Sequence, residues 1–138
     1  MDHDVTSRLP GYFRSNGHLD VGGGYGRTFR AAGTFGYFCM FHQGYGMTGK
    51  IVVPIGVSRS GGRFTIRVAS ASTSGTRWRN RVQVRKPGSS TWQTIATTAG
   101  TSGTFAPGAR GTYRFRSAVR NTDTGAASGF SPAVSTVY

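Results

Sequence analysis

Apolar and polar residues alternate with a period of two through much of the second half of the chain. Phe64, Ile66 and Val68 alternate with polar residues, and the same pattern recurs over residues 77–85 and 113–120. Successive side chains of a strand point to opposite faces of its sheet, so one face of each segment is expected in a core and the other in water. The three segments therefore predict strands of an antiparallel sandwich.

The first half of the chain holds shorter strand-like segments, separated by glycine, serine and proline. We expect strands there at residues 3–7, 27–31, 34–38 and 50–54. No long segment shows the apolar period of a helix, which is about 3.6 residues. The 22 glycines are also poor material for helix interiors. The whole chain is therefore predicted to be all-β.

Residues 56–62 are small, polar and rich in glycine, as linkers are. We expect a domain on either side of this stretch, residues 1–57 and residues 58–138. The density of basic residues also changes at this stretch. The formal net charge is +13, and residues 58–138 hold twelve of the 17 basic residues against the single acid Asp123. This asymmetry indicates two modules of different character.

The candidate metal-binding residues are concentrated in residues 33–53. Cys39 is the one cysteine of the chain, and His42 and Met47 follow it in a C-x2-H-x4-M pattern. A thiolate, an imidazole and a thioether suit copper, and a second histidine would complete a trigonal His2Cys set with a weak axial methionine. His3, at the head of a strand-like segment, and His18, in a loop, are the other histidines.

Two other interpretations of this cluster are weaker. Structural zinc requires four Cys or His ligands, and the chain has only one Cys and three His to offer in total. Cys39 could instead be a small buried hydrophobe with His42 and Met47 in a surface loop. Chance rarely supplies this spacing together with its strand–loop–strand setting, so we favour the copper site.

Residues 34–53 strongly resemble the copper-binding end of plastocyanin-like cupredoxins, in which an aromatic strand leads into C-x2-H-x4-M-x-G-x-V-x-V. Residues 3–6, His-Asp-Val-Thr, resemble the segment that supplies the first histidine ligand in that family. The resemblance implies one type 1 copper ion, held by four residues: His3, Cys39, His42 and Met47.

The resemblance covers residues 2–54 and implies part of a Greek-key sandwich. Such domains normally have several strands before the first histidine ligand, so we expect an N-terminally truncated cupredoxin whose signal peptide is absent from this chain. No apolar run of 18 residues is present, and we therefore expect no membrane span. The resemblance also implies an extracytoplasmic location, in a secreted or cell-surface bacterial protein.

The function implied is one-electron transfer, and not an enzymatic reaction. In multicopper oxidases the electron-accepting cysteine is flanked by histidines, whereas Phe38 and Met40 flank Cys39 here. In this family the second histidine typically presents its ring through an apolar surface patch. Met40, Phe41 and Tyr45 would form that patch and dock a redox partner protein of unknown identity. The alternative is that Phe41 and Tyr45 are simply packed against the rest of the protein.

Residues 58–138 resemble a fibronectin type III-like domain, an immunoglobulin-type β-sandwich, on residues 81–92, 111–116 and 125–134. Such domains serve as spacers and binding modules. This leaves an alternative function open: an extracellular adhesion or interaction protein in which the fibronectin-like module is functional and the copper half is a remnant.

The eleven arginines of the second half suggest two kinds of anionic partner. Phosphate contacts would give salt-dependent binding of nucleic acid. The arginines sit at alternating strand positions, however, where any sandwich places solvated side chains. We therefore favour attraction to an acidic cell-surface polymer or to an acidic redox partner, and we do not expect nucleic-acid binding.

Overall fold

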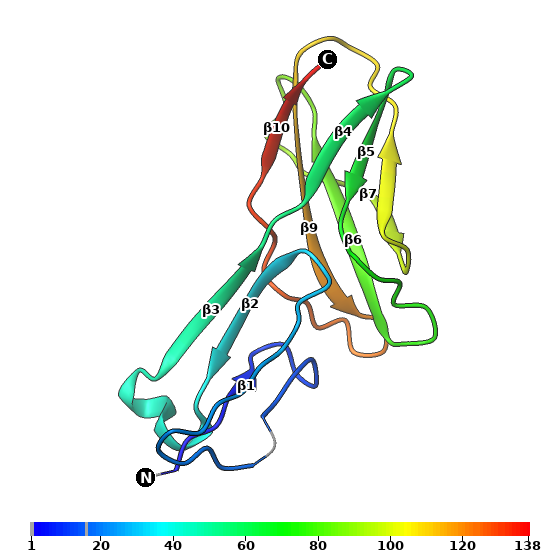
Figure 1. The fold of residues 1–138 in the computed structure, drawn as a ribbon. Coiled ribbons are helices and arrows are strands. Elements are labelled where there is room, and N and C mark those ends of the chain that lie inside the picture. The colour runs from blue at the N-terminus through cyan, green and yellow to red at the C-terminus, as the bar shows by residue number, and fades with distance from the viewer. Residues whose placement is uncertain (1, 16) are drawn as a thin grey trace.

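The structure is a computed structural model that describes residues 2–15 and 17–138, and its regular elements there are β-strands apart from one 3-10 helix (Figure 1). This confirms the all-β prediction. The elements in chain order are β1 (Thr6–Ser7), β2 (Gly33–Phe38), the 3-10 helix η1 (Met40–Tyr45), β3 (Thr48–Val53), β4 (Gly56–Ser60), β5 (Arg63–Arg67), β6 (Trp78–Arg85), β7 (Gln93–Thr98), β8 (Ser102–Phe105), β9 (Thr112–Asn121) and β10 (Val134–Val137).

The first half forms a three-stranded antiparallel sheet in the order β1-β2-β3. Its strands agree with three of the four predicted segments. The prediction of a strand at residues 27–31 is wrong. Within this described segment Ala31 alone takes part in a β-bridge, and its partner is Ala69. Backbone hydrogen bonds to residues 68 and 70 tie this segment down without a continuous ladder. Its aromatic residue Phe29 packs into a core instead.

The second half is a sandwich of two antiparallel sheets, in the orders β10-β9-β6-β7 and β4-β5-β8. Its core contains Phe64 and Ile66 from β5, Val82 and Val84 from β6 and Phe115 from β9, each fully buried. These are the apolar positions of the alternating pattern, so the predicted inward faces are confirmed. The intervening residues of β6 and β9 point away from the core, and most of them are arginines.

The interpretation of residues 56–62 as a linker is wrong. Residues Gly56–Ser60 form β4, which pairs with β5 in the register Val57↔Ile66. Gly61 and Gly62 have φ values of 57° and 73° and make the turn of this hairpin. An exposed edge strand needs few large apolar residues, so its composition resembles that of a linker. The predicted boundary after residue 57 falls inside β4, and the division into two domains stays a prediction.

The two halves pack against each other. A hydrophobic cluster joins Leu9, Phe13 and Phe35 of the first half to Ala69 and Val119 of the second. Figure 1 shows β3 running directly toward β4, while the start of β2 lies against the chain that leads to β10. The strand that leads to Cys39 is therefore anchored at its beginning by the second half of the molecule.

Candidate metal centre

The loop between β2 and β3 carries three of the predicted ligands. Cys39 lies between β2 and η1, and its backbone is extended. Cys39 is buried, with only 3% of its surface exposed. The N–H of Cys39 donates to the carbonyl of Met47 at 3.0 Å, which closes the loop at its base. Gly46, with φ of 73°, ends η1 in the left-handed region that glycine adopts without strain. The sequence of this loop therefore folds back on itself and brings Met47 beside Cys39.

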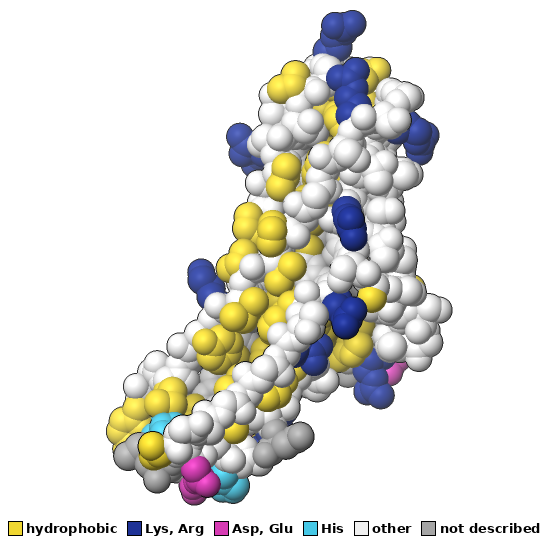
Figure 2. Space-filling view, in the orientation of Figure 1, with side chains coloured by type: hydrophobic (Ala, Val, Ile, Leu, Met, Phe, Trp, Pro, Cys, Tyr) yellow, Lys and Arg dark blue, Asp and Glu magenta, His cyan; other side chains and the backbone are white. Residues whose placement is uncertain are grey.

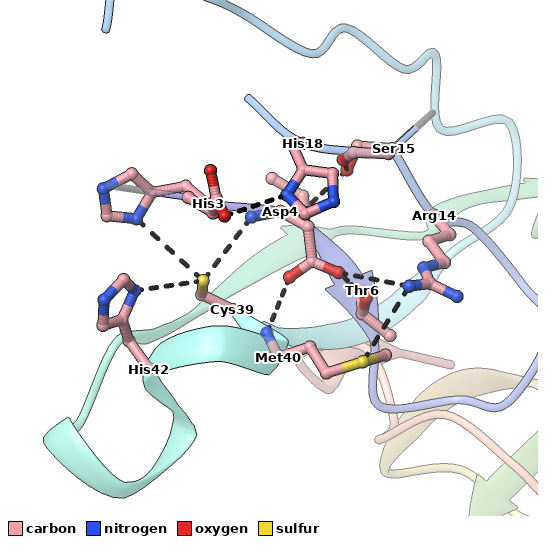
Figure 3. Close-up of polar contacts among 12 residues, drawn as sticks. His3, Asp4, Thr6, Arg14, Ser15, His18, Cys39, Met40 and His42 are labelled. Atoms are coloured by element: carbon pink, nitrogen blue, oxygen red, sulfur yellow. Dashed lines mark hydrogen bonds and ion pairs between the residues drawn. The ribbon is translucent and has the colours of Figure 1, made fainter. Parts of the chain in front are cut away.

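The first predicted ligand comes from a distant part of the chain. His3 lies before β1, and β1 pairs with β2 in the register Thr6↔Phe38. That pairing brings the residues just before β1 to the end of β2. The Nδ1 atom of His3 lies 4.0 Å from the Sγ atom of Cys39 and 3.3 Å from the Sδ atom of Met47. In Figure 3 the two histidine rings lie on the same side of the Cys39 sulfur.

His42 completes the cluster. Its Nδ1 atom lies 3.5 Å from the Sγ atom of Cys39, and its ring centroid lies 4.8 Å from that of His3. The ligand atoms of His3, Cys39 and His42 all lie within 4.8 Å of one another. The structure thus brings together all four residues that were predicted as ligands: His3, Cys39, His42 and Met47.

These distances fit a single metal ion. Bonds from a first-row metal to imidazole nitrogen and thiolate sulfur are roughly 2.0–2.3 Å long, so ligand atoms in a trigonal plane lie roughly 3.5–4.0 Å apart. The separations of Cys39 Sγ from the two histidine nitrogens are 3.5 Å and 4.0 Å. Two imidazoles, one thiolate and a nearby thioether are the donors of electron-transfer copper sites. The residues present therefore fit copper.

Residues 13–54 match copper binding proteins of the plastocyanin/azurin family. The matched segment contains Cys39, His42 and Met47, and His3 lies before it. No curated protein matches the chain. The family match and the His3–Cys39–His42 group agree on the metal, and the cofactor of the plastocyanin/azurin-like segment is copper.

Asp4 supports the metal centre from behind the sulfur (Figure 3). Its backbone N–H donates to the Sγ atom of Cys39 at 3.5 Å. Its buried carboxylate accepts hydrogen bonds from the N–H of Met40 at 2.6 Å and from the hydroxyl of Thr6 at 2.8 Å. Arg14 lies 3.7 Å from the same carboxylate. Asp4 therefore ties the segment carrying His3 to the loop carrying Cys39.

Several effects act on the ionisation of this carboxyl. Burial raises the pKa of Asp4, but the hydrogen bonds from Met40 and Thr6 and the charge of Arg14 lower it by more. The net pKa lies below the ordinary value, so the group is held as a carboxylate. Sequence reasoning did not single out Asp4 as a functional residue. The sequence signal that could have identified Asp4 is its position directly after His3.

The predicted docking patch surrounds His42 at the surface. Met40 and Phe41 are 47% and 45% exposed, and Tyr45 is 88% exposed. His42 itself is half-buried between this patch and the sulfur of Cys39. In the space-filling view a histidine lies among apolar side chains at the end of the molecule that carries the metal centre (Figure 2). A contiguous group of exposed apolar side chains, unlike a single one, is typical of a surface that binds another molecule.

His18 does not join the cluster in the described residues. Its Nδ1 atom lies 3.3 Å from a carboxylate oxygen of Asp2, and its ring stacks on Phe41 with centroids 4.9 Å apart. Of the two histidines that the sequence offered beside His42, the fold selects His3. Across residues 2–15 and 17–138, no helix is both long enough and apolar enough to cross a membrane.

Proposed function

We propose that this protein binds one type 1 copper ion through His3, Cys39, His42 and Met47 and carries single electrons. The observation that supports this most strongly is the meeting of His3 with Cys39. The two residues lie 36 positions apart in the chain, yet His3 Nδ1 is 4.0 Å from the Cys39 sulfur. A loop alone could bring Cys39, His42 and Met47 together. His3, the fourth residue, reaches the site only through the tertiary fold.

Copper, when bound, supplies a one-electron couple whose two oxidation states this soft and borderline ligand set can both accept. The role of the protein is to keep the ligand positions fixed. Cys39 is held by the Met47 carbonyl and by the N–H of Asp4. The N–H of His42 donates to the carbonyl of Cys39 at 3.2 Å. A loop bonded in this way resists rearrangement when the charge of the site changes, which favours fast electron transfer.

Electrons would enter and leave through His42. Its ring is half-buried, its Nδ1 faces the sulfur of Cys39, and the exposed side chains of Met40, Phe41 and Tyr45 surround it. A small apolar patch suits the brief encounters of redox proteins, which use small interfaces. We propose a redox partner protein that docks on this patch. The four ligand residues complete a type 1 set, which is why we propose a carrier and not an enzyme.

Cupredoxin domains typically function outside the cytoplasm, and we propose a secreted or cell-surface bacterial protein. The second half would then act as a fibronectin type III-like spacer module for the copper-binding half. Its sandwich packs on the copper half through the cluster that contains Leu9, Phe35 and Val119.

Titration of the protein with Cu(II) tests the function. We expect saturation at one equivalent, an intense thiolate-to-copper charge-transfer colour and a narrow-hyperfine electron paramagnetic resonance signal. His3→Gln should lose this signal, whereas His18→Gln, the matched control outside the cluster, should keep it. Copper binding without the thiolate colour, or no stoichiometric binding, would contradict the proposal. It would favour the alternative of an adhesion protein with a remnant copper half.

A further inference from the structure

A second chemical feature lies in the second half of the chain, on the outer face of the sheet that contains β6 and β9. The inward positions of both strands fill the core of the sandwich, and the alternate positions face away from it. Six of these outward positions are arginines: Arg79, Arg81 and Arg85 on β6, and Arg114, Arg116 and Arg120 on β9. This set is called the arginine face below.

The register of the two strands places like charges against each other. Arg79 is the direct cross-strand partner of Arg120, and Arg85 is the direct partner of Arg114. Directly opposed residues have Cβ atoms only about 4.5–5.5 Å apart, and like charges carried by such residues destabilise a sheet. The face therefore carries a cost to folding that an anionic ligand would remove.

The protein does not neutralise these charges itself. Asp123 is the one acidic residue of the second half, and its carboxylate lies 3.9 Å from Arg77, outside the arginine face. Among the described residues, the ion pairs involve Arg14, His18 and Arg77, and none of the six arginines. Their hydrogen bonds go to neutral oxygen atoms, such as that from Arg81 Nε to the hydroxyl of Thr94 at 3.1 Å.

The middle of the face is held rigidly. The guanidinium of Arg116 lies over the ring of Trp92 at 4.1 Å and over that of Phe130 at 3.8 Å. Two of its nitrogens donate to the side-chain oxygen of Gln83 at 2.9 Å and 2.8 Å. Burial, and next the charge of Arg85, lower the pKa of Arg116. A planar cation fixed in this way loses little conformational freedom when it binds an anion.

We infer that the arginine face binds a linear polysaccharide that carries carboxylate groups. Arginines two residues apart on one strand repeat at roughly 7 Å, and the rows on β6 and β9 extend over roughly 20 Å. A polymer with a regularly repeated charge can follow such rows, and guanidinium groups pair with carboxylates in a bidentate manner. This inference does not depend on the copper centre, which lies on the other half of the chain.

The same face is poorly suited to nucleic acid. Single strands are bound by exposed aromatic rings on which bases stack. Here Arg116 covers Trp92 and Phe130, and Arg85 also lies over Trp92, at 5.6 Å. Duplex DNA is read by a helix or a two-stranded ribbon that enters a groove. The inner strands β6 and β9 instead present their arginines from within a four-stranded sheet.

Two double variants of the full chain test the inference. Arg114→Gln with Arg120→Gln removes two exposed charges from the face. Arg63→Gln with Arg67→Gln removes two exposed charges from the outer side of β5, on the opposite sheet. Binding to polygalacturonate, to neutral dextran and to a short DNA duplex is measured by calorimetry at fixed ionic strength. Thermal unfolding of each variant verifies that the fold is kept.

The parent protein should bind polygalacturonate and not neutral dextran. The variant of the arginine face should bind polygalacturonate about tenfold more weakly, since each lost exposed ion pair is worth up to about fivefold. The β5 control should stay within about twofold of the parent, because its charges act only through general attraction. Equal losses for both variants would mean that net charge alone governs binding and would overturn the inference. A DNA duplex that binds more tightly than polygalacturonate, with loss only in the arginine-face variant, would also overturn it.

Discussion

Thr34 and Gly129 exchange two backbone hydrogen bonds across the junction of the two halves. The N–H of Thr34 donates to the Gly129 carbonyl at 2.9 Å, and the N–H of Gly129 donates to the Thr34 carbonyl at 3.0 Å. The hydroxyl of Thr34 also donates to the carbonyl of Phe130 at 2.8 Å. Thr34 lies in β2, five residues before Cys39. The second half of the chain therefore takes part in positioning the strand that leads to the metal centre.

Gly33 at this junction should tolerate no side chain. Its φ is +157°, and a Cβ atom there would lie 2.9 Å from both the Phe35 ring and the Ser128 hydroxyl. We expect Gly33→Ala to lower the free energy of unfolding of the metal-free protein by about 1–3 kcal/mol in urea denaturation. Gly24→Ala is the matched control, because a Cβ atom at Gly24 meets open space. Equal stability of the two variants would contradict the tight junction.

A fragment of residues 1–57 should not fold by itself. Its core residues Leu9 and Phe35 pack in the cluster that contains Ala69 and Val119, which the fragment lacks. The fragment also ends inside β4, whose partner β5 is missing. A chain of this size is marginal even with a complete core. We expect no cooperative thermal transition by circular dichroism without metal, and a sharp transition would count against this view of the packing.

Replacement of Cys39 with serine should abolish the blue colour. The sulfur of Cys39 is the atom that both His3 and His42 approach, and a hydroxyl cannot replace a thiolate as a soft ligand. The residue is buried, but serine is close to cysteine in size, so the fold should be kept. Visible absorption and electron paramagnetic resonance after Cu(II) addition measure the effect. A persistent blue signal in Cys39→Ser would remove this residue from the ligand set.

Met47→Leu should keep the colour and raise the reduction potential. The Sδ atom of Met47 lies 3.3 Å from His3 Nδ1, and loss of a weak axial donor destabilises Cu(II) more than Cu(I). If that loss is about 1.4 kcal/mol, the potential of a one-electron couple rises by about 60 mV. Met47 is 44% exposed and Met40 is 47% exposed, so Met40→Leu is a matched control. Voltammetry that finds the same potential in both variants would exclude Met47 as a ligand.

Two substitutions of Asp4 separate the contribution of its hydrogen bonds from that of its charge. Asp4→Ala removes the acceptor for Met40 N–H and for the Thr6 hydroxyl, and it should cost about 1–3 kcal/mol of unfolding free energy. Asp4→Asn keeps an oxygen acceptor for Met40 and loses the charge that faces Arg14, so its loss should be smaller. Urea denaturation of the metal-free variants compares them. The reverse order of stability would mean that the charge matters more than the hydrogen bonds.

Sequence patterns were sufficient where the signal is local. The alternation around Phe64 and Phe115 predicted which residues face the core, because a strand has a fixed period and one face must leave water. The C-x2-H-x4-M spacing predicted a ligand loop, because nine residues that fold back on themselves cannot separate their side chains far. Composition fails where different structures use the same residues: the edge strand β4 has the small polar residues of a linker, so composition does not distinguish the two.

By itself, the sequence determined the all-β class, the inward faces of the strands and the three metal-binding candidates of one loop. The resemblance of residues 3–6 pointed to His3, but only the tertiary structure shows that His3 meets Cys39, because that contact depends on the pairing of β1 with β2 across about 30 residues of intervening chain. It also decided that Arg79 opposes Arg120, and that Asp4 lies beneath Met40. Strand register and long-range contacts arise from the packing of the whole chain, and no local pattern encodes them.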